Sequence, residues 1–135
     1  MAAGTTKTEL PRRGDILRYV YLFLRESRER DEGVKERPVV VIDADPATRR
    51  VAVLAVTTKG ERHPGTIALP DAVASAAGLA RGSAVVVSEY NAFTWLGYDI
   101  RPVANGFVAG RLPPAFTHKI LTAAATGGAV AVERD

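Results

Sequence analysis

With 135 residues, of which 47% are hydrophobic and 24% charged, the chain has enough apolar side chains for one packed core but not for two. Its formal net charge of +3 excludes a histone-like polycation, and the absence of cysteine excludes disulfides and thiolate chemistry. The N-terminal residues lack the apolar segment of a signal peptide, and the longest apolar run, residues 19–24, is too short to span a membrane. We therefore expect a cytoplasmic protein.

The pattern of apolar residues predicts a series of short strands after a polar leader. We expect residues 1–10 to be disordered and residues 11–135 to form a single domain. Aromatic and β-branched residues favour a strand over residues 16–24, although the apolar spacing there also fits one helical face. Runs of Val, Ile and Thr between turn-forming residues predict further strands at 39–43, 50–57, 66–69, 83–89, 91–95 and 99–103, and an edge strand at 129–132.

Two helices are expected among these strands. The proline at position 70 precedes a helix over residues 72–77, and the Pro-Pro pair at 113–114 begins a second helix that ends at the glycines 127–128. A long polar loop, residues 25–36, follows the first strand. Many short strands with two helices are typical of a mainly β protein, built as a small barrel with added helices.

Three motifs in the first half carry a family resemblance. They are P-R-R-G-D-I at residues 11–16, K-E-R-P-V-V-V-I at residues 35–42 and V-L-A-V-T at residues 53–57. In this order and spacing they resemble the MazF/PemK-like toxins, which are small endoribonucleases of toxin–antitoxin pairs. The resemblance implies an SH3-like barrel that cleaves single-stranded RNA by attack of the ribose 2′-OH, without a metal. It also implies a homodimer and a cognate antitoxin as partner.

Arg37 is the first candidate for a catalytic residue. It lies at the exit of the polar loop, where Pro38 and the strand behind it would hold a permanently charged guanidinium in place. Such a cation stabilises the negative charge that develops on a phosphorane. The resemblance makes the arginine of the R-P-V motif catalytic, and that arginine corresponds to Arg37. The alternative is a surface arginine paired with Glu36 or Glu32.

Thr57 is the second candidate, at the end of the third expected strand. The resemblance gives the threonine of this motif a hydrogen bond to the reacting phosphate, a contact that stabilises a developing oxyanion. Thr57 is alternatively an ordinary strand residue, and Thr58 is the neighbour that would take the role if the register shifted by one. The general base is unassigned, because arginine is a poor proton acceptor. Glu36 and Glu89 are weak candidates for it.

The other expected RNA contacts lie in two loops and one later strand. The stretch S-E-Y-N-A-F-T-W at residues 88–95 departs from the R-T-I-D motif of the better-known toxins and resembles a subgroup of PemK-like growth inhibitors. Its aromatic residues would stack on bases, with core packing as the equal alternative for Phe93 and Trp95. A mechanism that pairs His63 with His118 is disfavoured. The expected RNA-binding residues are Lys35, Thr58, Lys59, His63, Asn91, Phe93 and Trp95.

We expect no metal and no other cofactor. The sequence has no phosphate-binding glycine loop and no zinc-ligand spacing, and Asp43 and Asp45 are interpreted as turn formers. A second function hypothesis is a barrel of the same fold that binds RNA or a partner without cleaving. The two hypotheses differ in whether Arg37 and Thr57 lie within reach of one phosphate.

Overall fold

The structure, a computed structural model, describes residues 9–27, 35–58, 65–104 and 106–135. Most of the expected leader and the centre of the long polar loop therefore lie outside the described residues. In chain order the elements are β1 (Asp15–Val20), α2 (Leu24–Ser27), β2 (Glu36–Ala44), β3 (Arg50–Thr57), β4 (Thr66–Ala68), α3 (Asp71–Ala76), β5 (Ala84–Val86), β6 (Glu89–Thr94), β7 (Ile100–Arg101), β8 (Val108–Arg111), α4 (Pro114–Thr126) and β9 (Val130–Glu133).

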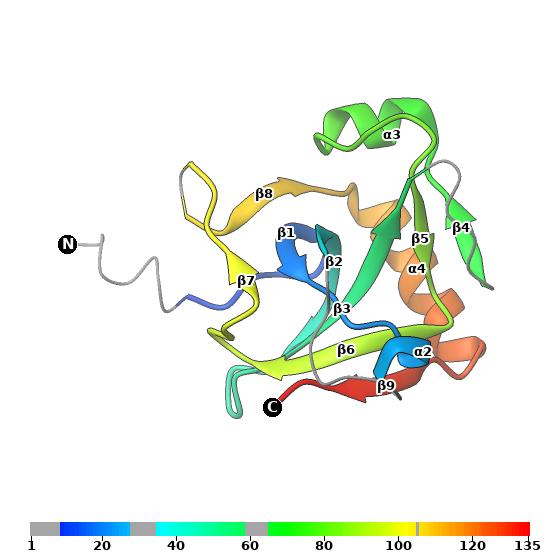
Figure 1. The fold of residues 1–135 in the computed structure, drawn as a ribbon. Helices are drawn as coiled ribbons and strands as arrows, with labels where there is room; N and C mark the ends of the chain where they lie inside the picture. Colours follow the sequence, from blue (N-terminus) through cyan, green and yellow to red (C-terminus); the bar gives the residue numbers. More distant parts are fainter. Residues whose placement is uncertain (1–8, 28–34, 59–64, 105) are drawn as a thin grey trace.

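The strands form one strongly curved sheet (Figure 1). Its main path runs β4-β5-β3-β2-β1-β7, while β6 pairs with β3 and β9, and β8 pairs with β1. The described strand pairs are antiparallel except for β6 with β9, which is parallel. The prediction of a mainly β small barrel with added helices is confirmed.

The central strands β2 and β3 are apolar on both faces because both faces are covered. Alternate residues of a strand point to opposite sides of the sheet, so a fully covered strand reads as a continuous apolar run. One cluster lies inside the curved sheet and includes Leu17, Tyr19, Val39, Val41, Val51, Val53, Phe93 and Trp95. The other lies between the sheet and the helices α3 and α4 and includes Ile16, Val40, Leu54, Val56, Ala74, Ala77 and Ile120.

The P-R-R-G-D-I motif forms the turn into β1. Gly14 has a φ of +91°, which favours glycine, and a Cβ atom there would lie 2.7 Å from the Thr117 hydroxyl oxygen of α4. The buried carboxylate of Asp15 accepts a hydrogen bond from the Arg12 backbone N–H at 2.7 Å and forms an ion pair with Arg111 of β8 at 2.8 Å. The motif therefore fixes the start of the barrel.

Several expected boundaries were wrong. The first strand ends at Val20 instead of residue 24, because the chain leaves the sheet ladder there and begins α2 at Leu24. The strand expected at 83–89 is two strands, since β5 ends at Val86 and β6 begins at Glu89. Both pair with β3, but the second neighbour is β4 for β5 and β9 for β6. β8 was not predicted, because its four residues include a glycine and only one β-branched side chain.

Candidate functional site

Arg37 and Thr57 occupy adjacent ends of two paired strands. β2 begins at Glu36 and β3 ends at Thr57, and the two strands pair with Val39 opposite Ala55. The described pairing ends with Val39 and Ala55, and Arg37 and Thr57 each lie two positions beyond this pair. Directly opposite residues in such a pair share one face of the sheet. Since side chains two positions apart in a strand point to the same side, Arg37 and Thr57 lie at the same edge of the two strands, on the face that forms the interior of the barrel.

The Arg37 guanidinium lies against an aromatic ring. Its Cζ atom is 4.8 Å from the centroid of the Phe23 ring, a cation–π geometry. Arg37 is only 8% exposed, and it is paired in the sheet with the buried residue Tyr19 of β1. Arg37 is therefore buried, and the alternative of a surface arginine is wrong. The guanidinium is held at one end of the apolar core.

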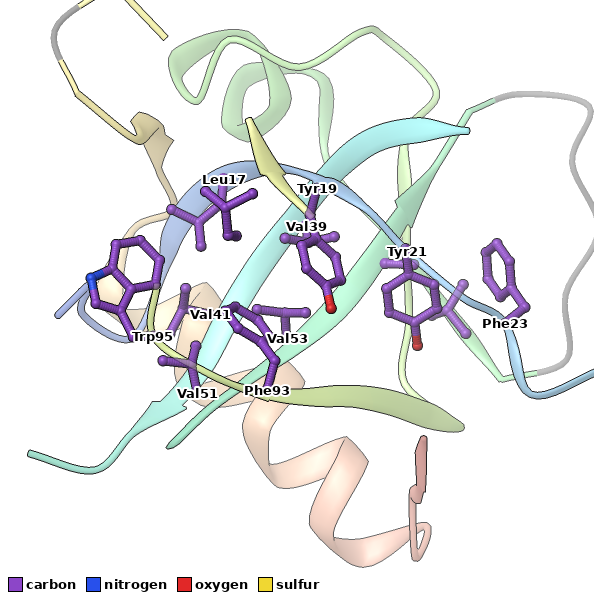
Figure 2. Packing of buried hydrophobic residues seen from close by; sticks show 13 residues of the cluster. Leu17, Tyr19, Tyr21, Phe23, Val39, Val41, Val51, Val53, Phe93 and Trp95 are labelled. Atoms are coloured by element: carbon purple, nitrogen blue, oxygen red, sulfur yellow. The ribbon is translucent and has the colours of Figure 1, made fainter. Parts of the chain in front are cut away.

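A row of aromatic side chains runs through the core from Trp95 to Phe23 (Figure 2). Successive ring centroids lie 6.4 Å apart for Trp95 and Phe93, 4.9 Å for Phe93 and Tyr19, 6.5 Å for Tyr19 and Tyr21, and 4.8 Å for Tyr21 and Phe23. Offset and edge-on pairs at these separations are favourable. Tyr21 packs against the Phe23 ring and helps to hold it in place. The Phe23 ring in turn contacts Arg37.

Two polar side chains of β6 hold the segment that carries Phe23. The Asn91 side chain accepts a hydrogen bond from the Leu22 N–H at 2.9 Å and donates one to the Leu22 carbonyl at 2.8 Å. Glu89 Oε2 accepts hydrogen bonds from the Leu24 N–H at 2.9 Å and from the Tyr21 hydroxyl at 3.3 Å. The two side chains therefore act in place of a neighbouring strand after β1 has ended.

Tyr21 stays protonated in this environment. Burial raises the pKa of the Tyr21 hydroxyl well above its ordinary value, and the Glu89 carboxylate and its hydrogen bond raise it further. The positive charge of Arg37 acts in the opposite direction on this pKa but is the smaller effect. Tyr21 is thus a hydrogen-bond donor to Glu89.

The Thr57 hydroxyl is almost completely covered. Thr57 is 2% exposed, and its Oγ1 donates a long hydrogen bond of 3.4 Å to the carbonyl of Ala84 in β5. A contact this long is weak, so a phosphate oxygen that reached the hydroxyl could replace the carbonyl as its acceptor. Thr58 is exposed and, with Lys35 and Ser83, lines an adjacent pocket of about 270 Å³.

Three of the expected RNA contacts require correction. Asn91 is 0% exposed, and its side chain is occupied by Leu22 and by the Arg134 Nη1 at 3.2 Å. Phe93 and Trp95 lie in the core, so the core-packing alternative holds for both rings. The physical reason is strand alternation, because Glu89, Asn91, Phe93 and Trp95 point to the same side and β6 places that side inward.

The remaining candidates fall into different places. Lys59 and His63 lie outside the described residues. Lys35 is exposed at the beginning of β2. Glu36, one candidate base, is paired with Arg18 at 2.8 Å on the surface. His118 is exposed on α4.

Sequence reasoning missed the contribution of Tyr21 and Phe23. Their alternation with Tyr19 was visible as an aromatic residue at every second position, which is the signal of one strand face. The local pattern does not say which elements this face will contact, so its approach to Arg37 could not be predicted. Within the described ranges, no cluster of three or more His, Asp or Glu side chains could hold a metal ion. No described helix is both long and apolar enough to cross a bilayer.

The fold and the buried arginine at one end of the core place the chain among the small, mainly β barrels with added helices. No family model matches the sequence, and a search of curated proteins gives no significant match. The fold is similar to that of a chain from the structure of an endoribonuclease in complex with its cognate antitoxin from a mycobacterial species. The TM-score is 0.54 at 21% sequence identity, and the match covers 87% of this chain and 93% of that chain.

Proposed function

We propose that residues 11–135 form an endoribonuclease toxin that cleaves single-stranded RNA with a sequence preference and is neutralised by a cognate antitoxin. The observation that supports the proposal is that Arg37 and Thr57 lie at the same edge of the paired strands β2 and β3, each two positions beyond the pair Val39 and Ala55. A fold shared with an endoribonuclease from an endoribonuclease–antitoxin complex supports it.

The proposed reaction is an internal transesterification. The ribose 2′-oxygen attacks the adjacent phosphorus, the bond from phosphorus to the 5′-oxygen breaks, and the products carry a 2′,3′-cyclic phosphate and a 5′-hydroxyl. Arg37 would donate two hydrogen bonds to the phosphorane oxygens, and Thr57 would donate one. These contacts strengthen as the negative charge develops, which is the condition for lowering the barrier. No step of this reaction requires a metal.

Glu89 is connected to this arrangement through hydrogen bonds. Through Oε2 it binds the Tyr21 hydroxyl and the Leu24 N–H, and both lie beside the ring that supports Arg37. Glu36 is held on the surface by Arg18. Of the two acidic residues considered from the sequence, Glu89 is thus the better candidate for the proton acceptor.

The proposal includes a cytoplasmic homodimer. An apolar pocket of about 240 Å³ lies between α4 and β6 and is lined by Ile42, Tyr90 and Leu121, and the nearby Val130 is 47% exposed. A second copy would cover these side chains, and a symmetric pair would place two basic sites on one surface. Sedimentation at micromolar concentration that gives only the 14.4 kDa monomer would contradict this part.

The test is cleavage of mixed-sequence single-stranded RNA by the purified chain, followed by mapping of the ends. We expect 2′,3′-cyclic phosphates, activity that persists in EDTA, and loss of cleavage by about 100-fold or more in Arg37→Ala. Arg81→Ala is the matched control, because Arg81 is exposed and forms a surface ion pair with Asp71. Full activity of Arg37→Ala, or loss of activity in EDTA, would refute the proposed mechanism.

A second candidate function is a barrel of the same fold that binds RNA or a partner without cleaving it. The observation that favours it is the burial of both Arg37 and Thr57. Under this alternative, the parent chain would bind RNA and leave it intact, and Arg37→Ala would affect only the stability of the fold. The same cleavage assay distinguishes the two functions.

A further inference from the structure

One buried ring at the candidate site carries two cations. Phe23 lies in the core, and the Arg37 and Arg25 Cζ atoms are 4.8 Å and 5.5 Å from the centroid of its ring. The two guanidinium carbons can therefore be no further apart than the sum of these distances. Arg37 is almost fully buried, whereas Arg25, on the short helix α2, is exposed to solvent.

Arg25 differs from most arginines in the part of the chain that the structure describes. Its position is fixed by an aromatic ring, and it forms no ion pair with a described carboxylate. Several other arginines, exposed or buried, each contact at least one carboxylate: Arg13, Arg18, Arg50, Arg81, Arg111 and Arg134. The charge of Arg25 is therefore held in place without a described counter-ion.

An aromatic face attracts a cation but does not neutralise it. Two guanidinium groups beside one ring repel each other, and the repulsion is least screened on the side that faces the core. An anion bound against both groups would offset this repulsion. A guanidinium binds a phosphate through two parallel hydrogen bonds, so a phosphodiester suits both positions.

We propose that Arg25 binds a phosphate of the RNA backbone next to the phosphate that Arg37 contacts. The inference rests on the proposed function, and it adds a substrate-binding residue to that site. A single RNA strand carries phosphates in series, and Arg25 and Arg37 are two cations in series at one edge of the barrel. Arg25 binds and positions the strand, while Arg37 acts on the reacting group.

The test measures binding separately from cleavage. The probe is a labelled single-stranded oligonucleotide of mixed sequence that is 2′-O-methylated throughout, so that attack by the 2′-oxygen is blocked. The affinity is measured by fluorescence anisotropy between 50 and 200 mM salt for the parent, Arg25→Ala, Arg25→Lys and Arg81→Ala. Each phosphate contact contributes about 0.7 to the slope of log affinity against log salt for a single strand.

We expect Arg25→Ala to bind more weakly and to lose one such contact. When the salt concentration rises fourfold, the factor by which the parent loses affinity should be about 2.6 times the factor for Arg25→Ala. Arg25→Lys keeps the charge and should retain the parent slope, and Arg81→Ala should match the parent in both slope and affinity. On cleavable RNA, Arg25→Ala should raise KM more than it lowers kcat, whereas Arg37→Ala should lower kcat.

Two results would overturn the inference in different ways. If the parent binds and cleaves RNA but Arg25→Ala has the slope and affinity of Arg81→Ala, Arg25 binds no phosphate and the proposed function stands. If the parent neither binds the methylated strand nor cleaves RNA, the proposed function fails and the inference fails with it. Unfolding curves of the variants establish that each is folded under the assay conditions.

Discussion

Replacing Asn91 by leucine should destabilise the fold, because the buried Asn91 side chain of β6 hydrogen-bonds the backbone of the segment after β1. Leucine has a similar shape but cannot hydrogen-bond. The substitution removes both partners of the buried Leu22 backbone, the acceptor of its N–H and the donor to its carbonyl. It also removes one of the acceptors of the Arg134 guanidinium, which keeps the Val20 carbonyl at 2.8 Å.

The expected loss follows from the two orphaned groups. Each buried backbone group without a partner costs about 1–3 kcal/mol, so Asn91→Leu should lower the free energy of unfolding by about 2–6 kcal/mol. The measurement is urea denaturation followed by tryptophan fluorescence and circular dichroism. Thr94→Val is the matched control on the same strand, since its hydroxyl bonds Asp135 at an exposed position. It should cost less than about 1 kcal/mol.

An unchanged stability of Asn91→Leu would favour the prediction from the sequence that Asn91 binds RNA. If Asn91→Leu has the same midpoint urea concentration of unfolding as the parent and instead loses RNA affinity, Asn91 contacts RNA and does not support the segment after β1. A loss equal to that of Thr94→Val would likewise show that the two Leu22 hydrogen bonds contribute little. An intermediate result with a changed slope of the transition would indicate an altered unfolded or native state.

Other substitutions test the remaining parts of the structure. Arg37→Lys should cleave RNA poorly in the kinetic assay, because an ammonium cannot reproduce the two-pronged contact of a guanidinium; near-parent kcat would refute this. The double variant of Arg37→Ala and Thr57→Ala should be little slower than either single variant, as for groups that serve one transition state, and additive losses would show that they act separately. Arg134→Met should lower the free energy of unfolding by about 3 kcal/mol, since the 3% exposed arginine side chain bonds Tyr19, Val20, Asn91 and Asp99. Gly110→Ala should cost about 1–3 kcal/mol in the same assay, because the new Cβ would lie 2.3 Å from the Ala77 carbonyl oxygen unless α3 moves away from β8.

The central strands could be predicted because their sequence pattern is local. The valine and isoleucine runs of β2 and β3 are bounded by turn residues. β3 has the expected limits, and β2 contains the expected strand and begins three residues earlier, at Glu36. The helix after Pro113 also lies where its proline and glycines predicted it. These elements follow from residues close in the chain, and tertiary contacts do not override them.

The inward face of β6 could not be predicted in the same way. A period of two gives two alternating sets of side chains, but it does not say which set faces the core. The sequence suggested that Asn91 faces RNA and left Phe93 between RNA and the core, whereas pairing with β3 and β9 turns both inward. The segment after β1 donates backbone hydrogen bonds to Asn91 and Glu89, which lie about seventy residues away in the chain. No local pattern contains that information.

The parallel pairing of β9 with β6 means that the sheet is completed late in the synthesis of residues 1–135. β9 follows all the other described strands in the chain, and the neighbouring Arg134 bonds the Val20 carbonyl and the Asn91 side chain. A nascent chain that still lacks these residues cannot close the sheet or complete the support beneath Phe23. Since domains fold as their segments emerge from the ribosome, the candidate site would take its final form only after residue 134 has been made.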